Sequence, residues 1–261
     1  FSLREVSSRI KVILKRYGRS EIASRSADVK GLGNCSVNDK TLEITYKEIP
    51  FDIVDEVILV DDRSPDATVE KAKELGIKHV IVHPNNRGYG GNQKTGYQWA
   101  LEKNLDAVIL LHGDGQYAPE YLPQMVEPII SGRADVVFGS RMITQGGARK
   151  GGMPLYKYVG NKILTYLQNS LAKVSLTEWH SGYRAYSVSA LRKVNFLKNS
   201  DYFDFDSQII LQMIGARQRI TEIEIPTFYG DEISRVNGIK YGLKILIHTL
   251  KFRLSSNKSY F

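Results

Sequence analysis

The segment Asp106-Ala107-Val108-Ile109-Leu110-Leu111 leads directly into His112-Gly113-Asp114-Gly115-Gln116. Residues 107–111 form an unbroken apolar run, which predicts a buried strand. Successive side chains of a strand point to opposite faces. With the extended backbone continued, His112, Asp114 and Gln116 share one face, and the glycines keep the other face small. Open α/β sheets bind ligands at the carboxyl ends of their strands, so we expect a metal and phosphate site here.

Strands and helices are expected to alternate on both sides of this segment. The expected strands are residues 56–61, 79–83 and 135–138, and the expected helices are residues 65–75, 90–103 and 119–130. Ser64 is the expected N-cap of the first helix, with Pro65 at its first position and Gly76 just beyond its end. This alternation predicts an α/β fold with a Rossmann-type, mostly parallel sheet covered by helices on both faces.

The second half of the chain has a different pattern. A glycine-rich and basic stretch at residues 144–152 is expected to be a mobile loop. Helices are expected at residues 154–173, 205–215 and 238–254, with a strand at 219–225. The last helix has apolar residues between Lys240, Lys244, Lys251 and Arg253, a pattern typical of basic amphipathic helices at membrane surfaces. The alternative is a terminal helix that packs on the sheet and leaves its basic side in water.

The composition narrows the class of protein. The chain has 261 residues, of which 42% are hydrophobic, and a formal net charge of +8. The charge favours an anionic partner such as nucleic acid, an anionic membrane or a phosphorylated substrate. A single cysteine, Cys35, excludes an intramolecular disulfide framework. No apolar run approaches the roughly 18–20 residues of a transmembrane helix, and Phe1-Ser2-Leu3-Arg4 does not resemble a signal peptide. We therefore expect a cytoplasmic protein.

Further motifs flank the central segment. Val60-Asp61-Asp62-Arg63-Ser64-Pro65 and Asn86-Arg87-Gly88-Tyr89-Gly90-Gly91 precede it, while Gly139-Ser140-Arg141 and His180-Ser181-Gly182-Tyr183-Arg184 follow it. In this order the chain from about Asn38 to Arg253 resembles the family 2 glycosyltransferases, and among them the dolichyl- and polyprenyl-phosphate sugar synthases. The resemblance implies a GT-A-like fold. It also implies inverting transfer of a sugar from a nucleotide-diphosphate donor to a polyprenyl or dolichyl phosphate.

The resemblance assigns the central segment to metal binding. Relatives use two aspartates that flank one residue, whereas this chain has His112 first, then Asp114, with Gln116 after it. A divalent cation would stabilise the departing nucleoside diphosphate as a Lewis acid. Imidazole favours transition metals, so we expect Mn²⁺ to serve at least as well as Mg²⁺. The alternative makes His112 a hydrogen-bonding loop residue beside a single metal ligand, Asp114.

The donor-binding candidates come from several segments. By resemblance, Asp61 and Asp62 contact the nucleotide and the diphosphate–metal unit. A glycine-rich loop before a helix can also offer backbone N–H groups to phosphate. Arginine can bind phosphate through two parallel hydrogen bonds, and a basic loop can close over a bound diphosphate. The further candidates are Asn86, Gly88, Gly90, Gly91, Lys94, Arg141, Arg184, Arg235 and Lys240. The alternatives are that Asp62 only caps a helix, that the glycines mark a turn, and that residues 229–240 form a solvated basic turn.

Glu178 stands near the place where relatives have an aspartate that faces the acceptor, so the resemblance makes Glu178 and His180 the acceptor-side candidates, with Asp114 as the further catalytic candidate. A hydroxyl acceptor needs a general base, whereas a phosphate acceptor is already ionised at pH 7 and needs only positioning. Glu178 is therefore either a base or an orienting group, and His180 competes for the same role.

The beginning of the chain departs from the family pattern. Relatives open with an apolar strand and a proline that are missing before Leu42. Residues 1–36 have apolar residues at helical spacing and form a basic amphipathic extension in one interpretation. In a second, residues 10–14 supply the missing strand and an insertion follows. In a third, the stretch is not native coding sequence. We expect the catalytic domain at 37–230 and a basic loop with an amphipathic helix at 231–261.

The sequence is also compatible with other functions. The chain could be a nucleotidyltransferase on a similar sheet, or a catalytically impaired module that binds nucleotide sugars or membranes. Nucleic-acid binding is disfavoured, because the basic residues lie in loops and a terminal helix and belong to no recognisable nucleic-acid-binding motif.

Overall fold

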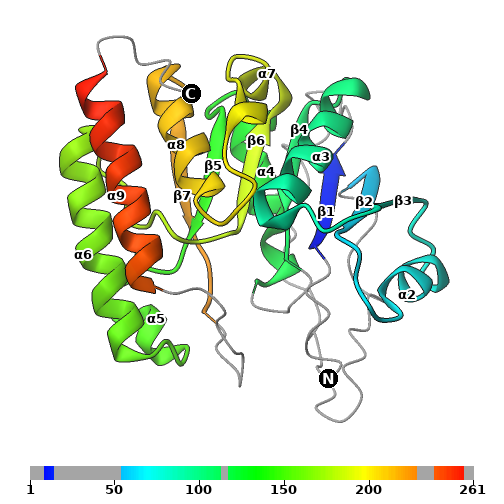
Figure 1. The fold of residues 1–261 in the computed structure, drawn as a ribbon, viewed down its shortest axis with the longest axis horizontal. Coiled ribbons are helices and arrows are strands. Elements are labelled where there is room, and N and C mark those ends of the chain that lie inside the picture. Colours follow the sequence, from blue (N-terminus) through cyan, green and yellow to red (C-terminus); the bar gives the residue numbers. More distant parts are fainter. Residues whose placement is uncertain (1–8, 15–53, 113–116, 228–237, 256–261) are drawn as a thin grey trace.

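A mixed sheet forms the centre of the protein (Figure 1). The computed structural model describes residues 9–14, 54–112, 117–227 and 238–255. Within these residues the sheet has 7 strands in the order β3-β2-β1-β4-β6-β5-β7. The strands are β1 (Arg9–Leu14), β2 (Glu56–Asp61), β3 (His79–Val82), β4 (Ala107–Leu110), β5 (Val136–Ser140), β6 (Arg184–Ser187) and β7 (Ile220–Glu224).

Most of these strands run in one direction. β2 pairs in parallel with β3, and β5 pairs in parallel with β7. β1 is antiparallel to both β2 and β4, and β6 is antiparallel to both β4 and β5. It follows that β2, β3, β4, β5 and β7 share one direction, as expected, while β1 and β6 are reversed. The carboxyl ends of the parallel strands therefore meet the start of β6 at one edge of the sheet.

β1 occupies the place between β2 and β4. Lys11 pairs with Ile58 on one side and with Leu110 on the other. Residues 9–14 are thus a strand and not part of an amphipathic helix, which agrees with the second interpretation of the chain's beginning. Residues 15–53, which follow the strand and hold the insertion in that interpretation, lie outside the described residues.

Helices cover both faces of the sheet. They are α2 (Thr68–Glu74), α3 (Gly88–Glu102), α4 (Leu122–Ile130), α5 (Gly147–Lys150), α6 (Leu155–Ala172), α7 (Val188–Leu191), α8 (Phe205–Gly215) and α9 (Gly238–Leu254). Short 3₁₀ turns lie at Pro119–Tyr121 and Phe196–Lys198.

The alternation of side chains along the strands produces two cores. Val108 of β4 joins a cluster with Tyr97 of α3 and Ile209 of α8. Its neighbour Ile109 joins another cluster with Met125 of α4. Because consecutive strand residues point to opposite faces, the two clusters lie on opposite sides of the sheet. This confirms the expected covering of both faces.

Two local expectations were wrong. The first helix begins at Thr68 with Ala67 at the N-cap position, so Ser64 is not its N-cap and Pro65 is not its first residue. The side chain of Asp66 instead accepts from the Thr68 N–H, at 3.1 Å. The stretch 144–152 contains the short helix α5 and is not wholly a loop.

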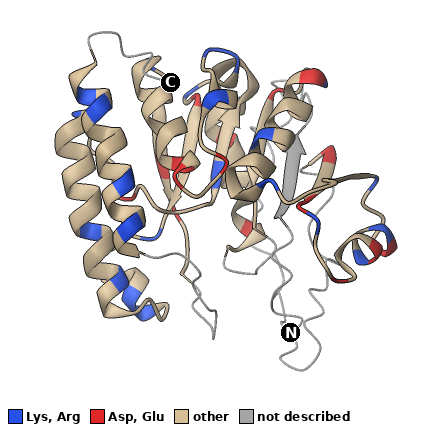
Figure 2. Ribbon diagram, in the orientation of Figure 1, with Lys and Arg blue, Asp and Glu red and all other residues tan. Residues whose placement is uncertain are grey.

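α6 and α9 pack against each other at one side of the molecule (Figure 1). α9 also packs on α8, where Lys244 and His248 pair with Asp204. Figure 2 shows basic residues along both α6 and α9. Among the described helices, none is both long enough and apolar enough to cross a membrane.

Candidate functional site

Several of the predicted site residues that the structure describes lie at one edge of the sheet. Asp61 ends β2, His112 follows β4, and Arg141 follows β5. Arg184 begins the reversed strand β6 and pairs with Leu110 of β4. The segment before Arg184 therefore reaches the same edge as the ends of the parallel strands. Sequence motifs far apart in the chain thus meet in space.

Asp61 has a buried carboxylate that is only partly satisfied. The side chain is 1% exposed, and Oδ2 accepts from the Ser64 N–H at 3.0 Å. Its Oδ1 is buried, and no described residue donates a hydrogen bond to it. A buried polar atom without a partner is costly, so this oxygen is suited to receive a donor from a ligand.

Asp62 holds the start of α3. Its Oδ1 accepts from the Arg87 N–H at 2.7 Å, and its Oδ2 accepts from the Gly88 N–H at 2.8 Å. His83 Nδ1 lies 2.8 Å from Oδ1. Asn86 donates to the carbonyl of Asp62 at 3.2 Å. In these contacts Asp62 acts as a helix cap, although it caps α3 and not the helix after Ser64.

The glycines of α3 allow a close approach to the segment before α8. Gly88 has a φ of +80°, and a Cβ there would lie 2.6 Å from the carbonyl oxygen of Asp201. The Gly90 and Gly91 N–H groups donate to that same carbonyl, at 2.7 and 3.3 Å. Lys94 pairs with the Asp201 carboxylate at 2.7 Å. Glycine is therefore needed here because a side chain would collide with the Asp201 segment. The Gly90 and Gly91 N–H groups, which were predicted to hold phosphate, already donate to the Asp201 carbonyl. Donor binding by this loop stays a prediction.

His112 lies in an aromatic setting. Its ring makes edge contacts with Tyr89 and Tyr117, at centroid distances of 5.7 and 5.3 Å. A Cβ at Gly182 would lie 2.5 Å from His112 Cε1, so only glycine leaves room for this imidazole. Tyr89 Oη donates to Asp206 Oδ2 at 2.7 Å and lies 3.3 Å from His112 Nε2. Because Tyr89 gives its proton to Asp206, the His112 Nε2 must be the donor in the second contact.

Asp206 and Arg184 form a buried pair behind this histidine. Gln93 donates to Asp206 Oδ1 at 3.0 Å, and Arg184 Nη1 lies 3.4 Å from the same oxygen. Arg184 is 1% exposed and donates to the carbonyls of Ser181, Trp179 and Asp206. The guanidinium thus fixes the backbone of the 179–184 segment. Sequence reasoning missed Asp206, because an acidic residue in the first turn of a helix is common and gave no signal.

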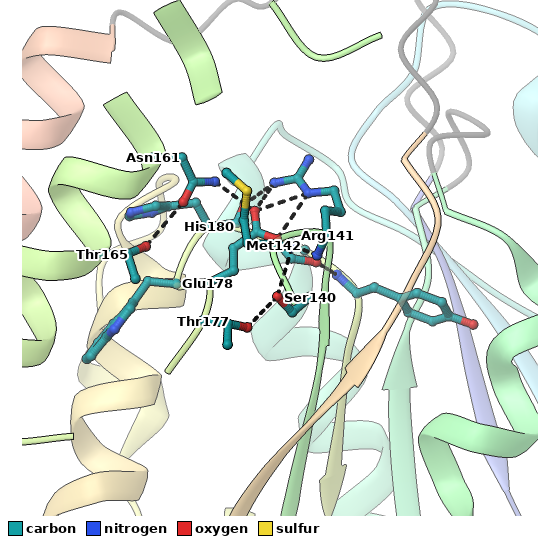
Figure 3. A network of polar contacts seen from close by, with 12 residues as sticks. Ser140, Arg141, Met142, Asn161, Thr165, Thr177, Glu178 and His180 are labelled. Atoms are coloured by element: carbon teal, nitrogen blue, oxygen red, sulfur yellow. Dashed lines mark hydrogen bonds and ion pairs between the residues drawn. The ribbon is translucent and has the colours of Figure 1, made fainter. Parts of the chain in front are cut away.

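Glu178 is bound on both oxygens by buried donors (Figure 3). Its Oε2 accepts from the Arg141 N–H at 2.8 Å, and its Oε1 accepts from Arg141 Nε at 3.1 Å and Asn161 Nδ2 at 2.8 Å. The Arg141 guanidinium also forms an ion pair with this carboxylate. Glu222 of β7 accepts from the Glu178 N–H at 3.1 Å and holds the segment in place.

These contacts decide the charge of Glu178. Burial raises the pKa of the carboxyl group, but the charge and hydrogen bonds of Arg141 outweigh this effect and the pKa falls below its usual value. A carboxylate held in this way is a weak base. Of the two predicted roles, the geometry favours the orienting one.

His180 lies beside this pair (Figure 3). Its Nδ1 is 3.3 Å from Tyr241 Oη of α9, and its carbonyl accepts from Arg141 Nη2 at 3.4 Å. Burial lowers the pKa of His180 from 6.5 to about 4. The imidazole is therefore neutral at pH 7. Lys240 precedes Tyr241 in the exposed first turn of α9.

Some predicted residues lie outside the described part of the chain. Asp114 and Gln116, the other expected metal ligands, fall within 113–116, and Arg235 falls within 228–237. Among the residues that the structure does describe, no group of three or more His, Cys, Asp or Glu side chains could hold a metal ion. The three-residue metal site and the closing loop therefore stay predictions.

Comparisons with known proteins agree with this architecture. The sequence model of the family described as "Glycosyl transferase family 2" matches residues 40–194. A relative from Methanocaldococcus jannaschii, an uncharacterized protein, is 31% identical over 209 residues, which cover 80% of this chain and 85% of the relative. A second relative is the UDP-N-acetylglucosamine–dolichyl-phosphate N-acetylglucosaminyltransferase of Methanococcus voltae. It is 29% identical over 217 residues, which cover 77% of this chain and 86% of that enzyme.

A solved structure shares the fold. It is glucosyl-3-phosphoglycerate synthase from Mycobacterium tuberculosis, crystallised with Mn²⁺, uridine diphosphate and phosphoglyceric acid. The TM-score is 0.54 at 19% identity, and the match covers 77% of this chain and 68% of the synthase. The expected GT-A-like α/β fold is thereby confirmed.

Proposed function

Because the chain belongs to glycosyl transferase family 2, we propose that it transfers a sugar from a nucleotide-diphosphate sugar to a polyprenyl or dolichyl phosphate, with inversion at the anomeric carbon. The observation that carries the proposal is the buried Asp61 Oδ1 at the end of β2, to which no described residue donates. The Methanococcus voltae relative, by its name, uses this class of donor and acceptor.

Asp61 would recognise the nucleoside. A carboxylate oxygen can only accept hydrogen bonds, so its ligand must present an N–H or O–H group, as a base or a ribose does. The other oxygen is held by Ser64, which fixes the orientation of the carboxylate. Because the side chain is buried, this contact is made away from water, where a charge-assisted hydrogen bond is strongest.

The acceptor side favours a phosphate over a hydroxyl. A hydroxyl acceptor needs a base of suitable pKa within reach. Glu178 is held by Arg141 with a lowered pKa, and the pKa of His180 is about 4. Both groups are weak bases at pH 7. A lipid phosphate is already ionised and needs only a cationic group that positions it. Arg141, oriented by Glu178, is our candidate for that role.

A divalent cation would be held by His112, Asp114 and Gln116. An imidazole nitrogen combined with carboxylate and amide oxygens suits Mn²⁺ as well as Mg²⁺. When bound, the cation would stabilise the departing diphosphate as a Lewis acid. The fit is supported by the His112 ring, which Tyr89, Tyr117 and Gly182 hold at the end of β4. Arg235 and Lys240 would close over the diphosphate.

The enzyme would work peripherally at the cytoplasmic face of a membrane, where a lipid-linked acceptor is found.

One experiment tests the reaction. The full chain is incubated with a panel of nucleotide sugars, Mn²⁺ and a polyprenyl phosphate, and the products are separated into organic and aqueous phases. We expect a glycolipid and a free nucleoside diphosphate, with Asp61→Asn raising the KM for the donor at least tenfold, since discriminating polar contacts are worth about 1.4 kcal/mol or more. A water-soluble glycoside as the only product would overturn the lipid acceptor, and release of pyrophosphate would indicate a nucleotidyltransferase.

A further inference from the structure

Asp206 is a buried carboxylate at which several hydrogen bonds end. It lies in the first turn of α8. Gln93 of α3 donates to its Oδ1 at 3.0 Å, and Arg184 Nη1 lies 3.4 Å from the same oxygen. Tyr89 donates to its Oδ2 at 2.7 Å. The two oxygens of this carboxylate therefore serve different partners.

Chemistry fixes the direction of each of these hydrogen bonds. An ionised carboxylate only accepts, whereas a phenol has a single proton to give. Tyr89 gives that proton to Asp206, so His112 Nε2 must carry a proton in its contact of 3.3 Å with the same hydroxyl. On the other branch Tyr97 donates to Gln93 Oε1 at 2.7 Å, which turns the amide nitrogen of Gln93 toward Asp206. Both branches thus point their protons at Asp206.

The His112 ring is closely confined in this arrangement. Tyr89 and Tyr117 make edge contacts with it, and a Cβ at Gly182 would lie 2.5 Å from Cε1 and 2.7 Å from Nε2. A neutral imidazole has one N–H group and one lone pair, and the hydrogen bond of one nitrogen decides which nitrogen has which. With the proton on Nε2, the lone pair is on Nδ1.

We propose that Asp206 is a positioning residue for His112. Through the Tyr89 hydroxyl it keeps the imidazole proton on Nε2, which makes Nδ1 the nitrogen that binds a divalent cation. Metal-ligating histidines are usually oriented by a partner on their other nitrogen, and loss of that partner typically lowers metal affinity about 10–100-fold. The role of the cation rests on the proposed function, whereas the position of the proton is a property of the metal-free protein.

The substitution Asp206→Asn is expected to reverse the network. Gln93 donates to Oδ1 and Arg184 Nη1 faces it, so the new amide oxygen should take this place and the N–H₂ group the place of Oδ2. The N–H₂ group then donates to Tyr89, whose own proton becomes available to His112. Nε2 must now accept, and the imidazole proton moves to Nδ1.

The substitution Tyr89→Phe separates this effect from charge. It removes the hydroxyl between Asp206 and His112 but keeps the ring and every charge. We expect the imidazole proton to lose its fixed place and to be shared between the two nitrogens. Because this variant does not depend on Asp206→Asn, it tests the proposal even where the latter fails to fold.

The test is NMR of the ring nitrogens in the histidine-labelled, metal-free full chain at mildly alkaline pH, where histidine is ordinarily neutral. The signals that are lost in His112→Asn identify this residue. We expect a protonated Nε2 in the wild type and a protonated Nδ1 in Asp206→Asn. The matched control is Asp204→Asn, which removes another buried carboxylate at the same end of α8 and should leave the His112 signals unchanged. Circular dichroism checks the fold of each variant.

Binding of Mn²⁺ alone, followed by electron paramagnetic resonance of the free ion, gives a second measurement. We expect Asp206→Asn and Tyr89→Phe to bind Mn²⁺ at least about tenfold more weakly than the wild type. The Asp204→Asn control should bind as the wild type does. Absence of Mn²⁺ binding by the wild type would refute the role of Nδ1.

The remaining outcomes also decide the proposal. A wild-type His112 with its proton on Nδ1 or on both nitrogens would overturn it, as would an unchanged proton position in Asp206→Asn. Weaker Mn²⁺ binding by Asp206→Asn alone, with Tyr89→Phe like the wild type, would assign the effect to charge and reject the positioning role. The expected proton shift and weaker binding in a protein that forms no glycolipid would support the positioning role and refute the proposed reaction.

Discussion

The Glu178→Gln substitution distinguishes a structural carboxylate from a catalytic base. In the wild type both oxygens of Glu178 accept hydrogen bonds, and the Arg141 guanidinium forms a buried ion pair with it. The glutamine removes the negative charge and turns an N–H₂ group toward donors. Arg141, which is 9% exposed, would then lose the negative charge that Glu178 places against its guanidinium.

The expected loss of stability is large. Removing one partner of a buried ion pair costs about 3–5 kcal/mol. In a chain of this size 1 kcal/mol shifts the Tm by about 2–4 °C, so the Tm should fall by roughly 6–20 °C. Thermal unfolding followed by circular dichroism at pH 7 measures this. The control is Glu74→Gln, which breaks the exposed Lys71–Glu74 pair and should move the Tm by less than about 2 °C.

The opposite result would refute the reasoning. If Glu178→Gln keeps the wild-type Tm but loses kcat and one limb of the pH–rate profile, Glu178 is a general base. The pH dependence gives a second check. Because the pKa of Glu178 is lowered in the folded protein, its stabilising contribution is present above the unfolded-state pKa and is lost as pH falls through the folded-state pKa. The glutamine variant should lack this part of the acid destabilisation.

The remaining predictions concern His180, the glycines and the cation. His180 has a pKa of about 4 against an ordinary 6.5, so the unfolded chain takes up a proton first and stability should fall as pH drops between these values; urea titrations of His180→Asn should lack this slope. Gly88 and Gly76 have similar positive φ angles, +80° and +79°, so Gly88→Ala and Gly76→Ala introduce similar backbone strain. Only a Cβ at Gly88 would meet Asp201, so the Tm of Gly88→Ala should fall further. Equal losses would show that packing against Asp201 is not the reason for the glycine. Chelation by EDTA should abolish transfer and Mn²⁺ should restore it at least as well as Mg²⁺; full activity in EDTA would refute the metal role.

Local patterns predicted much of the fold. The apolar run at residues 106–111 became β4 because its side chains are buried on both faces of the sheet, and the bounds of α8 and α9 were predicted correctly. The start of α2 was missed: Ser64 and Pro65 lie before the helix, and the Asp66 carboxylate accepts from the N–H of its first residue, Thr68. The short α5 was missed because glycines normally mark loops.

The site was harder to predict, since its contacts join distant residues. The glycines of α3 are visible in the sequence, but their partner Asp201 is not. Glu178 was singled out by its place shortly before the motif at residues 180–184. Its pairing with Arg141 depends on how β5 and the segment before β6 meet. Tyr89 lies in the glycine-rich motif at residues 86–91. Its hydrogen bond to Asp206 could not be predicted, because it depends on how α3 packs on α8.

The position of β1 has a consequence for how the chain folds. Within the described strands, β1 alone joins β2 and β3 to the rest of the sheet, and its Lys11 pairs with Leu110. That pairing closes a long loop, and the entropy of loop closure is lost before strand pairing and burial stabilise the contact. The pairing is therefore unfavourable early in folding. We expect β1 to insert last, between two half-sheets that have already formed. Until then the edges of β2 and β4 present unpaired backbone groups, which are templates for association between chains. Refolding at high protein concentration should therefore aggregate more than refolding at low concentration.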